Sequence, residues 1–166
     1  MKVLVAYGSK RGGTAGLAQM IGDELRLAGF DPAVLRAGDV KHVGEYDAVV
    51  IAGALYSMRW HRDARRFARR FDRELRDRPV WLVSSGPLDT SATTKEIPPV
   101  KQVRTVMEAI GARGHATFGG RLESTASGFP ASAMARTRAG DWRDPDHIHR
   151  WVLEVAQELG HVGSAA

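Results

Sequence analysis

Unbroken apolar runs that alternate with amphipathic stretches constrain the fold of this chain more than any other feature of its sequence. The runs over 2–7 and 47–54 lack polar alternation, which is typical of strands buried on both faces. Between them, apolar residues three and four positions apart predict a helix over 14–28. This alternation predicts an α/β fold, with a parallel sheet covered by helices on both faces. The other expected elements are strands over 30–37, 79–85 and 115–120, and helices over 62–75, 100–110 and 146–159.

The chain is expected to form one domain followed by a short tail. Its 166 residues suit a single domain, which we place over 1–160. Residues 161–166 are small and polar, and they predict a flexible C-terminal tail. No apolar run is long enough for a transmembrane helix, and there is no cysteine to form disulfides. We therefore expect a cytoplasmic protein, and we leave a homodimer open.

The chain is basic, with a formal net charge of +5, and its densest charge cluster lies over 62–78. One interpretation is a solvated helix whose arginines pair locally with Asp and Glu. The other is a docking face for an acidic partner or an anionic substrate. A non-catalytic basic binding module would also fit the charge, but no nucleic-acid recognition motif supports it, so no specific nucleic-acid partner is expected.

Three segments of unusual composition follow predicted strand ends. They are GSKRGGT over 8–14, GALYSMRWH over 53–61 and SSGPLD over 84–89. Ligands of open parallel sheets bind beyond the carboxyl ends of the strands. The predicted fold therefore implies that the three segments meet at one crevice.

The segment GSKRGGT has the composition of an anion site. Helix-start amides bind anions, glycines allow close approach, and the hydroxyls of Ser9 and Thr14 add hydrogen bonds. Lys10 and Arg11 add favourable charge. The segment has neither the Gly-Lys-Ser/Thr ending of a P-loop nor a GxGxxG pattern, which argues against ATP and against NAD bound in the usual Rossmann manner. It predicts a phosphate socket of another kind.

The same residues resemble the phosphate loop of flavodoxins, which follows a Thr/Ser-x-Thr-Gly-x-Thr pattern; Arg11 stands where the middle hydroxyl is common. The resemblance continues through YDAVVIAGALYSMRWH and DWRD…VLEVAQEL. It is nearest to the menaquinone-dependent protoporphyrinogen dehydrogenase branch, which has a similar loop over 52–61 and an Asp-Trp pair, here Asp141-Trp142. It implies a flavodoxin-like three-layer sandwich with a five-stranded parallel sheet in the order 2-1-3-4-5.

The resemblance implies FMN as the cofactor, with the deazaflavin F420 left open. Polar neighbours of Tyr56 and Trp60 argue against complete burial of these two rings and suit a contact with the flavin face. No catalytic residue is assigned and no metal site is expected. The implied phosphate contacts are Ser9, Lys10, Arg11, Gly12, Gly13 and Thr14; the ring contacts are Ala54, Leu55, Tyr56 and Trp60; and the contacts to the polar edge of the flavin are Ser85, Gly86, Pro87, Leu88 and Asp89.

Two departures from the flavodoxin pattern bear on function. Flavodoxin electron carriers are typically acidic, and they often have a glycine in the loop after the third strand, where a peptide can flip toward N5 of the flavin. This chain is basic, and its LYSMRW stretch has no glycine. These differences favour an FMN-dependent oxidoreductase that transfers two electrons between a reduced donor and a small organic or quinone-like acceptor. The alternative is a flavodoxin-type electron carrier that serves a redox protein.

One departure from the protoporphyrinogen dehydrogenase pattern bears on the acceptor. Those proteins carry an aromatic and hydrophobic insertion before the last helix. The equivalent segment here, over 122–140, is short, small and polar. This composition argues against peripheral membrane contact and against a membrane quinone as acceptor.

Overall fold

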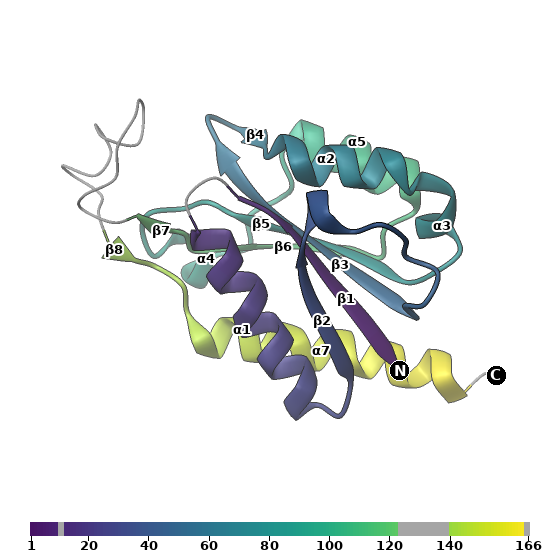
Figure 1. The fold of residues 1–166 in the computed structure, drawn as a ribbon. Coiled ribbons are helices and arrows are strands. Elements are labelled where there is room, and N and C mark those ends of the chain that lie inside the picture. The colour runs from purple at the N-terminus through teal and green to yellow at the C-terminus, as the bar shows by residue number, and fades with distance from the viewer. Residues whose placement is uncertain (10–11, 123–139, 165–166) are drawn as a thin grey trace.

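The computed structural model describes residues 1–9, 12–122 and 140–164, and in these residues a parallel sheet forms the centre of the fold. The five parallel strands lie in the order β2-β1-β3-β5-β6, which confirms the predicted order (Figure 1). β2 is an edge strand in which Pro32, opposite Val3, has no amide hydrogen to donate. The strands are β1 (Lys2–Gly8), β2 (Asp31–Arg36), β3 (Ala48–Tyr56), β5 (Val80–Ser85) and β6 (Gly114–Phe118).

Helices cover both faces of the sheet, as predicted for a three-layer sandwich (Figure 1). One apolar cluster packs α1 (Gly13–Leu27) and α7 (Pro145–Ser164) on one face. The other packs α2 (Arg62–Arg70), α3 (Asp72–Arg76) and α5 (Lys101–Ile110) on the opposite face. The central strands β1, β3 and β5 contribute buried residues to both clusters, which explains their unbroken apolar sequences. Two short elements, η1 (Ala37–Asp39) and α4 (Ser91–Thr94), lie in connections.

Several boundaries differ from the sequence prediction. The helix predicted over 62–75 is two helices, because Phe71 leaves the helical conformation with φ −109° and ψ 25°. α7 continues to Ser164 rather than ending near Leu159, because Gly160 remains within the helix instead of reversing the chain. The helix therefore includes residues 161–164 of the predicted tail. No helix among the described residues is both long enough and apolar enough to span a membrane.

Short antiparallel strands add two hairpins that the sequence did not predict. β4 (Arg59–Trp60) folds back on β3, and β7 (Arg121–Leu122) pairs with β8 (Gly140–Asp141). Both hairpins lie at the end of the sheet where the parallel strands finish (Figure 1). They surround the edge at which a ligand of this fold class would bind.

Candidate functional site

The start of α1 directly follows the carboxyl end of β1, so its first backbone amides lie at the edge of the sheet. Gly12 is the N-cap residue, with a left-handed φ of 78°, and its carbonyl accepts a hydrogen bond from the Gly16 amide at 3.0 Å. Among the described residues, no side chain bonds to this cap, and the first turn contains no acidic residue. The first amides of a helix have no partner within the helix, so this end of α1 can bind an anion.

Gly13, the first residue of α1, lies close to the backbone of β7, where a larger residue would be crowded. A Cβ atom on Gly13 would lie 3.1 Å from the backbone oxygen of Arg121 in β7. Thr14, the next residue, is buried, and Ser9 at the end of β1 is partly buried. Lys10 and Arg11, the two cations expected in this socket, lie outside the described residues.

The β7–β8 hairpin brings an ion pair to the side of α1. The guanidinium of Arg143 donates from Nε and from a terminal nitrogen to the two carboxylate oxygens of Asp141, at 2.9 and 2.6 Å. These hydrogen bonds lower the pKa of the Asp141 carboxyl. A Cβ atom on Gly16 would collide with the Arg143 guanidinium in its present position, so this guanidinium lies directly against α1. Asp141, from the Asp-Trp pair noted in the sequence, therefore positions an arginine against α1.

The segment after β3 forms a tight hairpin rather than an open loop. Leu55 pairs with Trp60 and Tyr56 with Arg59, so Ser57 and Met58 form a two-residue turn. Both turn residues have positive φ, 49° and 63°. This conformation costs a residue with a side chain about 1–2 kcal/mol and is usually filled by Asn-Gly in hairpins. The flanking strand pairs must therefore hold the turn.

The expectation that the Trp60 side chain is incompletely buried is wrong. Its side chain is 1% exposed and lies in the core, where Nε1 donates to the carbonyl oxygens of Gly53 at 3.1 Å and Val83 at 3.3 Å. A Cβ atom on Gly53 would collide with the indole ring. The β4 pairing turns Trp60 under the sheet edge, where an aromatic ring with one donor finds two carbonyl acceptors. Trp60 therefore anchors the hairpin.

The segment after β5 lies against the last residues of β3. A Cβ atom on Gly86 would lie 3.1 Å from the Leu55 side chain, so these two predicted site residues are neighbours. The Gly86 amide donates to the carbonyl of Phe118 at 3.2 Å, and Pro87 accepts from the Gly120 amide at 2.8 Å. Further along, Ser85 is buried, Pro87 and Leu88 are partly buried, and the Asp89 carboxylate accepts from the Ser91 amide at 2.8 Å. The predicted segments thus meet at the carboxyl edge.

A cavity of about 620 Å³ lies at the carboxyl ends of β1, β2 and β3. We call it the basic cavity, because four arginines line it together with one carboxylate, Asp63. Of the predicted site residues, Ser9, Tyr56 and Trp60 also line it. The connections from β1 and β3 lead to helices on opposite faces, so the cavity lies at the switch point where ligands of such sheets bind. Its arginines are Arg36, Arg59, Arg62 and Arg65.

His61 at the edge of the basic cavity is held in one orientation. Its side chain is 14% exposed, and Nδ1 accepts a hydrogen bond from the Asp63 amide at 3.2 Å as the N-cap of α2. Burial lowers the pKa of this imidazole, and Asp63 opposes the shift only in part. At neutral pH the ring is therefore uncharged, with its proton on Nε2.

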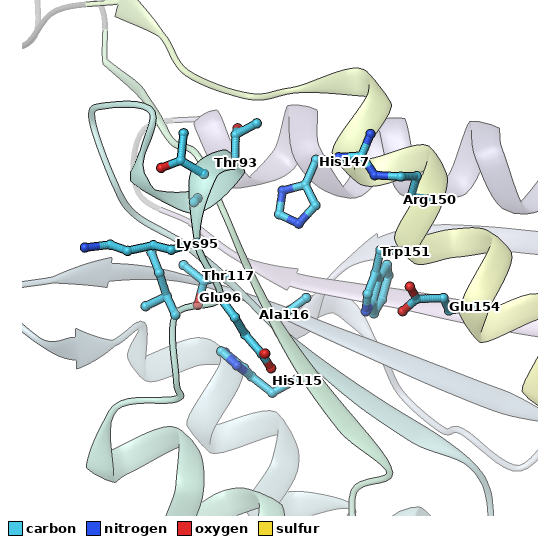
Figure 2. Close-up of a pocket in the computed structure, with 13 residues that line it drawn as sticks. Thr93, Lys95, Glu96, His115, Ala116, Thr117, His147, Arg150, Trp151 and Glu154 are labelled. Atoms are coloured by element: carbon cyan, nitrogen blue, oxygen red, sulfur yellow. The ribbon is translucent and has the colours of Figure 1, made fainter.

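A second cavity, of about 530 Å³, lies between β6, α4 and α7 (Figure 2). The ring of His147 points into it, and Trp151 forms one wall (Figure 2). His115 also lines it, with Nε2 2.9 Å from the Ser84 hydroxyl, and burial lowers the pKa of His115 to about 4. None of the residues predicted to bind a flavin lines this second cavity.

The sequence analysis did not predict that Arg36 and Arg59 lie beside the arginines of α2. Arg36 ends β2 and Arg59 lies in β4, so they are distant in sequence from each other and from α2. Only the fold brings them together. Their positions alone could have indicated this, because Arg36 ends a strand and Arg59 follows one at the carboxyl edge of the sheet.

Comparison with known proteins agrees with this architecture. A family model described as the flavodoxin domain matches residues 4–136. A search of curated proteins gave no match. Among solved structures, a flavodoxin from the domain Archaea aligns with TM-score 0.61 and 16% identity over 97% of this chain and 100% of that chain. Oxidised flavodoxin 2 from Bacillus cereus aligns with TM-score 0.62 and 15% identity over 95% and 99%. Two-electron reduced Megasphaera elsdenii flavodoxin aligns with TM-score 0.57 and 21% identity over 69% and 84%.

Proposed function

This chain belongs to the flavodoxin domain family, and from that membership we propose that it binds FMN at the carboxyl edge of its sheet and acts in electron transfer. The observation that carries the proposal is the start of α1. Its amides lack a side-chain cap among the described residues, and a Cβ atom on Gly12 would meet no other atom within 4 Å. These features suit a phosphate dianion. They would also accept the phosphate of a deazaflavin, so F420 is the second cofactor to test.

The proposed contacts follow the three segments that meet at this edge. Ser9, Lys10, Arg11, Gly12, Gly13 and Thr14 would hold the phosphate. Ala54, Leu55 and Tyr56 would line the flavin ring, and 85–89 would contact its polar edge. Trp60 is left out because it is buried in the core. When bound, FMN would supply the one- or two-electron chemistry that the side chains of this protein cannot perform.

We propose further that the protein is an oxidoreductase that transfers two electrons from a reduced donor to a small organic or quinone-like acceptor. The support is the turn after β3. Ser57 and Met58 both have positive φ, and neither is a glycine. A flip of the peptide bond between them would require new backbone angles that only glycine adopts without strain. The resemblance to protoporphyrinogen dehydrogenases stays a prediction, because 123–139, which covers most of the segment that differs from that branch, lies outside the described residues.

Anaerobic reduction of the FMN-loaded protein with dithionite tests this proposal. We expect the flavin absorbance to bleach in one two-electron step, with no long-wavelength band at half reduction. The variant Met58→Gly is the matched comparison, because it gives the turn the glycine that electron carriers often have. A stable long-wavelength band in the unmodified protein would instead support the electron carrier, and a band that appears only in Met58→Gly would trace the difference to this turn.

A further inference from the structure

The basic cavity is a region of concentrated positive charge beside the proposed phosphate socket. Its four arginines come from β2, β4 and α2, and the lining contains a single carboxylate. That carboxylate, on Asp63, lies 3.8 Å from Nε of Arg62, which leaves three guanidinium groups without an acidic partner in the lining. Like charges held together repel one another unless an anion lies between them.

We propose that the basic cavity is a separate binding site for a small polyanion, a molecule that carries at least two phosphate or carboxylate groups. Guanidinium groups bind such groups through paired hydrogen bonds. The volume of about 620 Å³ suits a small organic ligand. The site would adjoin the flavin, since Ser9 and Tyr56 belong both to the cavity lining and to the proposed flavin contacts.

One arginine of the cavity is already oriented. Arg65 is partly buried, and its Nε donates to the carbonyl of Trp60 at 3.1 Å. Trp60 is itself fixed in the core by its two indole hydrogen bonds. The terminal nitrogens of Arg65 make no hydrogen bond or ion pair within the part of the chain that the structure describes. An arginine fixed at Nε loses less conformational freedom when it binds a ligand.

Two further arginines are exposed and available. The guanidinium groups of Arg36 and Arg59 make no hydrogen bond or ion pair with any residue in the ranges 1–9, 12–122 and 140–164. His61 adds a hydrogen-bond donor without adding charge, because its Nδ1 is occupied by the Asp63 amide. The cavity therefore offers donors from β2, β4 and α2.

The second cavity provides an internal comparison. Its charged lining residues are balanced, with Lys95 and Arg150 against Glu96 and Glu154 (Figure 2). A cavity of similar volume in the same protein thus has no excess of either sign. The charge of the basic cavity is a local property and does not simply follow from the net charge of +5.

Calorimetric titration of the FMN-saturated protein with pyrophosphate, and separately with citrate, tests the proposal at low ionic strength. We expect at least one probe to bind one site per chain, and Arg36→Gln/Arg59→Gln to weaken that binding at least tenfold. The matched control is Arg26→Gln/Arg104→Gln, which removes the same charge from α1 and α5 and should change the dissociation constant less than threefold. Tighter binding of pyrophosphate or of citrate identifies the natural ligand as a phosphate or a carboxylate compound.

Three results would overturn the proposal: no binding of either probe, equal weakening by both double variants, or loss of probe binding when FMN is added. Its failure is separable from failure of the flavin proposal. If FMN does not bind, the same titrations of the cofactor-free protein still test the cavity, because Arg36→Gln/Arg59→Gln removes charge from the cavity and leaves the socket residues at α1 unchanged. If FMN binds normally and the probes do not, the polyanion site alone is wrong.

Discussion

Replacement of Trp60 by alanine is expected to lower the free energy of unfolding by about 3–5 kcal/mol, as for other large aromatic side chains removed from a core. The indole is 1% exposed and packs in the cluster formed by β3, α2 and α5. Its removal also leaves the carbonyls of Gly53 and Val83 without their side-chain donor. Urea denaturation of the two proteins measures the difference.

The variant Trp60→Phe separates anchoring from flavin contact. It keeps an aromatic ring in the core but removes the N–H donor and part of the indole volume, so we expect a loss of about 1–3 kcal/mol, smaller than that of Trp60→Ala. The affinity for FMN should stay unchanged in this variant. If Trp60→Ala were as stable as the unmodified protein but bound FMN poorly, Trp60 would be a wall of the flavin site, and its assignment as a core anchor would be contradicted.

Acidification is expected to destabilise the fold through His115. Burial lowers the pKa of this imidazole from 6.5 to about 4, so the unfolded chain takes up a proton at a higher pH than the folded protein does. The free energy of unfolding therefore carries no penalty from His115 above pH 6.5, and it decreases as the pH falls from 6.5 toward 4. A pKa difference of this size between the folded and unfolded chain corresponds to a loss of about 3 kcal/mol. Urea denaturation at a series of pH values across this range measures it.

The variant His115→Gln isolates this contribution. Glutamine keeps a polar group beside the Ser84 hydroxyl but does not titrate. Burial also lowers the pKa values of His61 and His147, so some loss of stability on acidification should remain. The difference between the two proteins should grow as the pH falls from 6.5 and should level off below 4. A difference that is independent of pH would show that His115 is protonated normally in the folded protein.

Much of the fold follows from local patterns in the sequence. The apolar runs of β1, β3 and β5 are buried on both faces, and the helical spacing of α1 and α7 places their apolar residues in one cluster. Pro32 correctly indicated an edge strand. The division of the helix at Phe71 was missed, because the apolar spacing through Phe67, Phe71 and Leu75 is compatible with one continuous helix.

The site was less accessible to prediction because it depends on pairing between distant segments. The β3–β4 hairpin has no Asn-Gly or Asp-Gly signal, and its two turn residues adopt a conformation that their types rarely favour. Without the hairpin, Trp60 resembles an exposed loop aromatic. The convergence of Arg36 and Arg59 on α2 depends on the strand order and could not be read from spacing.

The amides at the start of α1 are the basis of the proposed flavin site, and a change of charge at Gly13 tests them. Gly13→Asp adds a negative charge at the start of α1, beside the proposed phosphate position, whereas Gly13→Asn adds a side chain of the same shape without charge. Either Cβ atom would lie 3.1 Å from the backbone oxygen of Arg121, so the informative quantity is the difference between the two variants. We expect FMN to bind at least about tenfold more weakly to the Asp variant than to the Asn variant, a difference of about 1.4 kcal/mol or more. Riboflavin, which lacks the phosphate, should bind the two variants equally.

Titration of flavin fluorescence with the unmodified protein, using FMN and riboflavin in parallel, is the simplest test of phosphate binding at α1. We expect one FMN bound per chain, with riboflavin bound at least about tenfold more weakly because it cannot use the helix-start amides. Failure to bind FMN, or equal dissociation constants for FMN and riboflavin, would contradict the proposed flavin site.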